Sequence, residues 1–161
     1  LVVGDETVNP GVQLRIEPGV ILKFAEGKSL LVNGILDAVG TPSQRIIFTS
    51  AKDDTVGGDS NGDKTATWPQ PGDWGRLYFG DSSADPFTRL KYAELRFAGK
   101  KGNSILDGIF VDSASPTLEE NLVVQNAGYG LHLRNQATPT LRRNLILDNQ
   151  SGGVFLEQTS A

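Results

Sequence analysis

An internal repeat of 23 residues constrains this chain more than any other feature of its sequence. Residues 114–136 (ASPTLEENLVVQNAGYGLHLRNQ) and residues 137–159 (ATPTLRRNLILDNQSGGVFLEQT) agree at nine positions when they are aligned without a gap. A weaker earlier copy, Gly108-Ile-Phe-Val111, precedes Gly130-Leu-His-Leu133 by 22 residues. Each unit holds short aliphatic runs that are broken by Asn, Gly and Pro and lack helical spacing. Because one such unit cannot bury its own apolar side chains, the units are expected to stack.

The repeat predicts columns of asparagine where the chain turns. At an offset of 23, Asn121 lies over Asn144, and Asn126 lies over Asn149. Stacked Asn side chains can hydrogen-bond along such a column and satisfy the backbone of the turns. We therefore interpret both pairs as structural ladders.

Opposite charges also meet at this offset, in coils that are expected to lie about 4.8 Å apart. Exposed ion pairs contribute only about 0–1 kcal/mol each, so these pairs are expected to set the register more than to stabilise the fold. The pairs are Glu119 over Arg142, Glu120 over Arg143, and Arg134 over Glu157.

The first fifty residues show the same style of short strands and tight turns, with breaks at Glu17-Pro-Gly19, Glu26-Gly27, Asn33-Gly34 and Gly40-Thr-Pro42. The phrases IEPGVILKFAEGKSLLVNG and VGTPSQRIIFTSA, with the later SPTLEEN and TPTLRRN, resemble right-handed parallel β-helix proteins of the pectate-lyase-like superfold. That resemblance covers nearly the whole chain. It implies a fold that is common in secreted and surface-attached proteins, but it implies no single activity, since the scaffold hosts lyases, hydrolases, adhesins and inert spacers.

We predict an all-β chain in which residues 1–161 form a single right-handed parallel β-helix of about six or seven coils, with one long loop at residues 51–73. Leucine-rich repeats have a similar period, but their L-x-x-L-x-L frame is absent here. A new coil would begin near Thr159–Ala161, where Ser160 takes the place of Ala137. We therefore expect this to be the N-terminal part of a longer chain. Further coils of that chain, or end-to-end self-association, would then cover the last coil.

The loop at residues 51–73 is rich in carboxylates and has no apolar run. Loops of this length in compact domains are usually functional or disordered. Asp59-Ser-Asn-Gly-Asp63 offers oxygen ligands from Asp59, Asn61 and Asp63, as in the opening of a calcium loop. The chain departs from an EF-hand at Lys64 and Gln70, so we predict an irregular calcium site that orders the loop. The acids expected to complete its shell are Asp53, Asp54 and Asp73. The alternative is a solvated acidic loop.

Two tryptophans flank the Pro-rich end of this loop. Trp74 leads into the strand that follows, so it is expected to pack on the coil beneath. Trp68 is the better candidate for exposure, where its flat face would serve as a platform for a pyranose ring. The alternative for Trp68 is a half-buried anchor of the loop.

The single histidine, His132, would have to carry any imidazole chemistry. Its repeat partners are Phe110 and Phe155, and strand alternation predicts that all three face solvent. We interpret them as an outer aromatic column that forms a lateral contact surface or a ligand face. The clear repeats never stack carboxylate on carboxylate, and Asp107 and Asp112 lack partners that the repeat can place. We therefore expect no catalytic residues in this chain.

The composition of the chain also argues against some classes of binding partner. The formal charge is −4, from 15 Lys and Arg against 19 Asp and Glu, which argues against nucleic acid. Cysteine is absent, and no apolar run approaches the roughly 20 residues of a membrane span. We predict a non-enzymatic secreted or cell-surface module, structural or adhesive, that contacts polysaccharide or another surface component. The alternative is a fragment of a polysaccharide lyase or glycoside hydrolase whose catalytic coils lie outside this chain.

Overall fold

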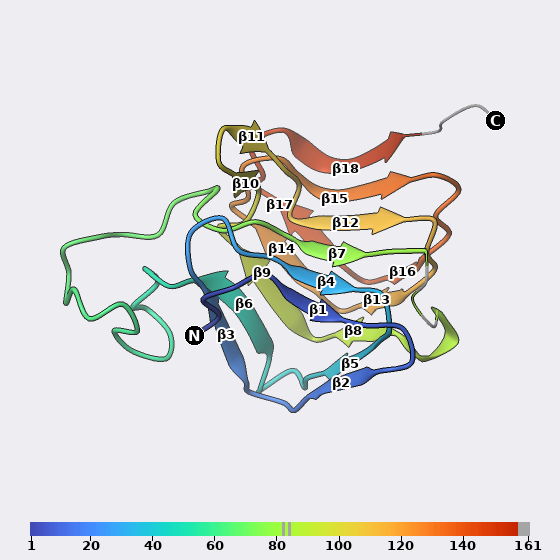
Figure 1. Ribbon diagram of the computed structural model, residues 1–161, viewed down its shortest axis with the longest axis horizontal. Helices are drawn as coiled ribbons and strands as arrows, with labels where there is room; N and C mark the ends of the chain where they lie inside the picture. The colour runs from blue at the N-terminus through green and yellow to red at the C-terminus, as the bar shows by residue number, and fades with distance from the viewer. Residues whose placement is uncertain (82, 84, 158–161) are drawn as a thin grey trace.

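The chain winds into a solenoid whose faces are three parallel β-sheets (Figure 1). The computed structural model describes residues 1–81, 83 and 85–157. Sheet I has six strands in the order β1 (Glu6–Val8), β4 (Leu30–Val32), β7 (Leu77–Phe79), β12 (Ile109–Asp112), β15 (Tyr129–Arg134) and β18 (Gly152–Glu157). Sheet II has five, in the order β2 (Gln13–Ile16), β5 (Ile35–Val39), β8 (Arg89–Lys91), β13 (Thr117–Glu119) and β16 (Thr140–Arg142). Sheet III has five, in the order β3 (Ile21–Phe24), β6 (Ile46–Ser50), β9 (Ala93–Arg96), β14 (Leu122–Val124) and β17 (Leu145–Leu147).

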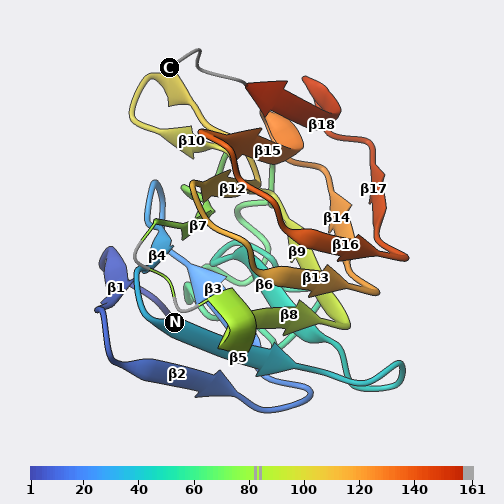
Figure 2. The same cartoon turned by 90° about the vertical axis from the view of Figure 1, so that its right-hand side faces the viewer.

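The chain visits the three sheets in turn, so each turn of the solenoid adds one strand to each sheet. Figure 2 shows sheet II side-on, with β2 at one end and β16 at the other. The result is a right-handed solenoid of about six turns, which confirms the predicted fold class. Two short elements interrupt the winding: the antiparallel hairpin of β10 (Lys100–Lys101) and β11 (Ser104–Ile105), and a 3-10 turn at Asp85–Phe87.

The repeat sets the register between coils. Leu118 pairs with Leu141, and Val123 pairs with Ile146, both at the offset of 23. Ile109 pairs with Leu131 at the offset of 22. Identical or similar residues therefore stack in columns along the solenoid axis, as the repeat predicts.

Alternate side chains of every sheet point inward and form one continuous core. Trp74 is completely buried in it and stacks on Phe24, with ring centroids 4.3 Å apart and an interplanar angle of 11°. The Trp74 Nε1–H donates to the carbonyl oxygen of Arg96 at 2.8 Å. Trp74 therefore packs on the coil beneath, as predicted, and holds the end of the long loop in place.

The core positions of the last coil are much more exposed than those below them. Leu141 is 42% exposed and Leu156 is 66% exposed, whereas their partners Leu118 and Leu133 are buried. These side chains have no described coil stacked on them. The further coil expected from Thr159–Ala161 lies outside the described residues.

Asparagine side chains link the coils at two turns. The Asn121 Nδ2 donates to Asn144 Oδ1 at 3.0 Å, and the Asn126 Nδ2 donates to Asn149 Oδ1 at 2.7 Å. The Asn121 Oδ1 also accepts from the backbone N–H of Ala93, at 2.9 Å. The two predicted pairs therefore form hydrogen bonds between coils and satisfy turn backbone.

Replacing Asn121 with alanine is expected to lower the free energy of unfolding by about 1–3 kcal/mol, because the substitution leaves buried backbone groups unpaired. The groups concerned are the N–H of Ala93 and the carbonyl of Leu90. Urea unfolding measures the loss. Asn144→Ala is the matched control, since Asn144 is less buried and ends the same column. Equal losses in the two variants would contradict the ladder as described.

The charged residues keep the predicted strand register, but Glu119 forms ion pairs with residues other than the predicted Arg142. Glu119 lies opposite Arg142 in the register, yet its ion pairs run to Arg143 and to Lys91, the latter at 2.7 Å. Arg143 also pairs with Glu120. Arg143 has a left-handed backbone, with φ of 49°, which ends the strand and turns its side chain back toward both glutamates. The hydrogen bond from Lys91 is the main reason that the pKa of Glu119 lies below its usual value.

A charge exchange tests this pairing. Glu119→Lys is expected to lower the melting temperature, because it places like charges beside Lys91 and Arg143. Adding Lys91→Glu is expected to recover part of the loss, since it restores one opposite pair. Adding Arg142→Glu instead is expected to recover less. Recovery by Arg142→Glu that equals or exceeds the recovery by Lys91→Glu would contradict the assignment of Lys91 as the closer partner.

Candidate functional site

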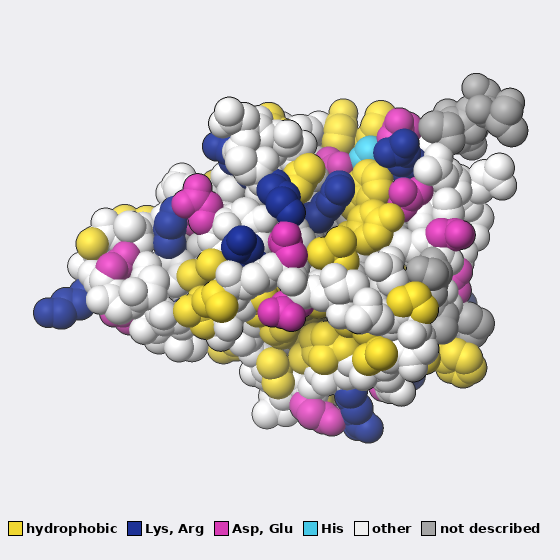
Figure 3. Space-filling model, viewed as in Figure 1, with side chains coloured by type: hydrophobic (Ala, Val, Ile, Leu, Met, Phe, Trp, Pro, Cys, Tyr) yellow, Lys and Arg dark blue, Asp and Glu magenta, His cyan; other side chains and the backbone are white. Residues whose placement is uncertain are grey.

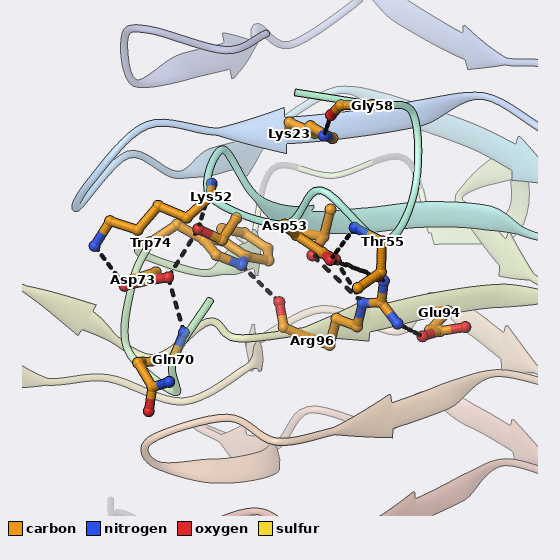
Figure 4. A network of polar contacts seen from close by, with 12 residues as sticks. Lys23, Lys52, Asp53, Thr55, Gly58, Gln70, Asp73, Trp74, Glu94 and Arg96 are labelled. Carbon is orange, nitrogen blue, oxygen red and sulfur yellow. Dashed lines mark hydrogen bonds and ion pairs between the residues drawn. The ribbon is translucent and has the colours of Figure 1, made fainter. Parts of the chain in front are cut away.

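The long loop leaves the solenoid after β6 and is tied back to sheet III by a buried carboxylate (Figure 4). Asp53 is completely buried, and its Oδ2 lies 2.6 Å from the Arg96 Nη2. The Oδ2 also accepts from Thr49 Oγ1 at 2.5 Å, and the Oδ1 accepts from Thr55 Oγ1 at 2.6 Å. Burial by itself raises the pKa of Asp53, but these hydroxyl donors and the charge of Arg96 outweigh it and hold that pKa below its usual value.

A second carboxylate anchors the other end of the loop. Asp73 accepts from Ser50 Oγ at 2.8 Å, from Lys52 Nζ at 3.0 Å, and from the backbone N–H of Gln70 at 2.9 Å (Figure 4). Asp53 and Asp73 were both expected to complete a calcium shell. The structure instead places them in these two anchoring networks, because each buried carboxylate is already surrounded by donors.

Three other acids of the loop do come together. Asp54, Asp59 and Asp63 offer carboxylate oxygens that all lie within 4.8 Å of one another. One oxygen of Asp54 and one of Asp63, the Oδ1 in each case, are buried without a hydrogen-bond partner. Asn61 lies beside them and donates its Nδ2 to Asp63 Oδ2 at 2.7 Å. Four of the six predicted metal ligands are thus close together, and two of them carry oxygens that lack a donor.

Trp68 lies in the Pro-rich end of the same loop and is 66% exposed. It borders a cavity of about 180 Å³ whose walls are Lys52, Asp54, Thr55, Thr65, Thr67, Trp68 and Pro69. Thr67 donates its hydroxyl to Asp63 and accepts from Asn61 Nδ2. The predicted metal ligands and the predicted aromatic platform therefore lie next to each other. Asp54 belongs to the acid cluster and to the cavity wall, and Thr67 of the cavity wall hydrogen-bonds to Asp63 and Asn61.

The outer face of sheet I holds the predicted aromatic column. Phe110, His132 and Phe155 are in register on β12, β15 and β18. The predicted exposure is wrong for two of them, since Phe110 is 6% exposed and His132 8%, against 37% for Phe155. The side chains point away from the core, but they cover one another edge-on, with His132 between the two phenylalanine rings at 4.6 and 4.8 Å. The guanidinium of Arg76 covers the other side of Phe110, 4.4 Å from the ring centroid.

Two carboxylates hold His132, and the sequence placed neither of them beside it. The Nδ1 lies 2.7 Å from Asp107 Oδ2, and the Nε2 lies 3.1 Å from Glu157 Oε2. Figure 3 shows the histidine, in cyan, among acidic and basic side chains on this face. His132 therefore cross-links three successive coils. The offset of 22 could have predicted the position of Asp107, because it places Asp107 beside Tyr129. The Asp107 Oδ1 accepts a hydrogen bond from the backbone N–H of Tyr129 at 2.9 Å.

Comparison with known proteins agrees with this architecture. Residues 94–161 match the family described as "Right handed beta helix region". Protein bark beetle of Drosophila melanogaster is 52% identical over 46 residues, which make up 29% of this chain and 2% of that protein. No solved structure matches. Within the described residues, no helix has the length and apolar character needed to cross a membrane. The three-sheet solenoid, with the family match over residues 94–161, shows that this chain has a right-handed parallel β-helix fold.

Proposed function

We propose that this β-helix is a non-catalytic, secreted or cell-surface module that binds polysaccharide through its long loop. The observation that carries the proposal is the exposed face of Trp68, which borders a small cavity with largely apolar walls. An indole face matches the apolar face of a pyranose ring. Thr65 also borders the cavity, and its hydroxyl is a suitable partner for a sugar hydroxyl. The solenoid supplies a rigid base, to which Asp53 and Asp73 fasten the loop.

We further propose that the loop binds calcium through Asp54, Asp59 and Asp63, with Asn61 as an additional oxygen ligand. Calcium takes 6–8 oxygen ligands and favours carboxylates and amides. The donor set fits this chemistry, because three carboxylates lie together and two of their buried oxygens have no hydrogen-bond partner. A bound cation would offset the mutual repulsion of the acids and order the loop around Trp68.

Chelation tests the calcium proposal. A chelator is expected to lower the melting temperature of the wild type measured in calcium, because it removes a ligand that binds the folded chain. Asp63→Asn is expected to abolish this difference. Asp148→Asn is the matched control, since it removes one exposed acid from the turn after β17 and should keep the wild-type response. Identical melting of the wild type with and without chelator would remove the calcium site.

Co-sedimentation with a panel of insoluble polysaccharides, in calcium, tests the binding proposal. The wild type is expected to bind selectively, and Trp68→Ala is expected to lose that binding. Phe87→Ala is the matched control, because Phe87 is 65% exposed but lies outside the loop, in the 3-10 turn. Failure of the wild type to bind any polysaccharide, or equal binding by Trp68→Ala, would overturn the proposal.

A further inference from the structure

The outer face of sheet I carries an arginine that has no hydrogen-bond acceptor or ion-pair partner among the described residues. Arg76 directly precedes β7, and its guanidinium lies 4.4 Å from the centroid of the Phe110 ring and 5.6 Å from that of Tyr78. The side chain is half-buried, and this burial lowers the pKa of Arg76 from its usual value. The two rings hold the guanidinium by cation–π contacts, and none of its N–H groups donates to an acceptor among the described residues.

The acids of this face make their hydrogen bonds to other groups and none to Arg76. Asp107 contacts His132 Nδ1 and accepts from the backbone N–H of Tyr129. Asp112 accepts from Asn135 and from the Tyr78 hydroxyl, and Glu157 contacts His132 Nε2. Asp107 and Asp112 still attract Arg76 at longer range, which keeps the cation on this face. A second guanidinium nearby is also incompletely bonded, since Arg134 Nε is buried without a hydrogen bond and lies 3.8 Å from Glu157.

We propose that Arg76 is the centre of a binding site for a carboxylate group. The planar guanidinium fork matches a carboxylate in bidentate geometry. The rings of Tyr78 and Phe110 hold the arginine in one orientation, so less conformational entropy is lost when a ligand binds. Phe110 and His132 are covered, so neither ring beside Arg76 offers a platform for stacking a sugar. Recognition here is therefore by charge and hydrogen bonding, and it is independent of the Trp68 loop.

Side-chain NMR of the arginine Nε–H groups tests this site directly. Wild-type protein is titrated with acetate and, separately, with glutamate blocked at its amino and α-carboxyl groups, against chloride at equal ionic strength. Both carboxylates are expected to give saturable shifts of the Arg76 Nε–H and of the β7 amides, whereas chloride gives none. Tighter binding of the blocked glutamate would identify a polypeptide side chain as the ligand, and equal binding would identify a small free carboxylate.

Three variants complete the test. Arg76→Gln is expected to abolish the saturable shifts of the β7 amides, and Arg76→Lys, which keeps the charge without the fork, is expected to weaken them. Arg15→Gln is the matched control, since Arg15 is an exposed arginine paired with Glu17. The proposal is overturned if neither carboxylate gives saturable shifts in the wild type. It is equally overturned if the shifts persist unchanged in Arg76→Gln.

Discussion

Trp74→Ala is expected to lower the free energy of unfolding by about 3–5 kcal/mol, which is the usual loss for truncating a large buried aromatic side chain. Trp74 is completely buried, stacks on Phe24 and donates to the carbonyl of Arg96. Its removal leaves a cavity between coils and an unpaired carbonyl at the end of β9. Equilibrium unfolding in urea measures the loss.

The other tryptophan is the natural control for this measurement. Trp68→Ala is expected to change the free energy of unfolding by no more than about 0.5 kcal/mol, as for exposed side chains in general. A loss for Trp74→Ala no larger than that for Trp68→Ala would contradict the described packing. The pair thus separates a residue that maintains the fold from one that we assign to binding.

Asp53→Ala is expected to cost about 3–5 kcal/mol, the typical loss when one partner of a buried ion pair is removed. The substitution leaves Arg96 largely buried and takes the acceptor away from Thr49 and Thr55. Arg96 retains an ion pair with Glu94 at 2.9 Å, which places the expected loss toward the lower end of that range. Asp53→Asn is the closer variant in shape and is expected to lose less, because the amide oxygen can still accept hydrogen bonds.

The same residue makes stability depend on pH. The pKa of Asp53 in the folded chain lies below its ordinary value of 3.8, so the unfolded chain takes up the proton first as the pH falls. The stabilisation by Asp53 is therefore complete above that value and is lost as the pH drops through the folded pKa. The difference in unfolding free energy between wild type and Asp53→Asn is expected to shrink below about pH 4. A difference that stays constant across this range would contradict a charged Asp53 in the folded chain.

The sequence predicted the winding of this chain well, because repeated residues stack on their own copies. The offset of 23 correctly predicts the register of β13 to β18 and both asparagine pairs. Residues without a repeated partner were harder to place. Arg76 precedes the clear repeats, so no offset indicated that it would cover Phe110, and only the weaker offset of 22 places Asp107 close to His132. The hairpin of β10 and β11 also lies outside the repeat.

The loop shows a second limit of sequence patterns. Five aspartates within residues 53–73 look alike in the sequence, yet two anchor the loop and three form a cluster. Which carboxylate is buried depends on side chains from other coils, such as Arg96 of β9, and the spacing within the loop carries no information about them. The exposure of Trp68 was easier to predict, since its polar and Pro-rich neighbours offer no apolar surface to cover it.

Iodide quenching of tryptophan fluorescence, with soluble fragments of a polysaccharide that co-sediments with the chain, tests the central claim most directly. Trp74 is buried and shielded from iodide, so the quenched emission reports on Trp68. The account predicts that the sugar protects Trp68 from iodide when calcium is present, because the pyranose ring covers the indole face. A polysaccharide that binds the chain but leaves the quenching unchanged would show that Trp68 is not the binding surface.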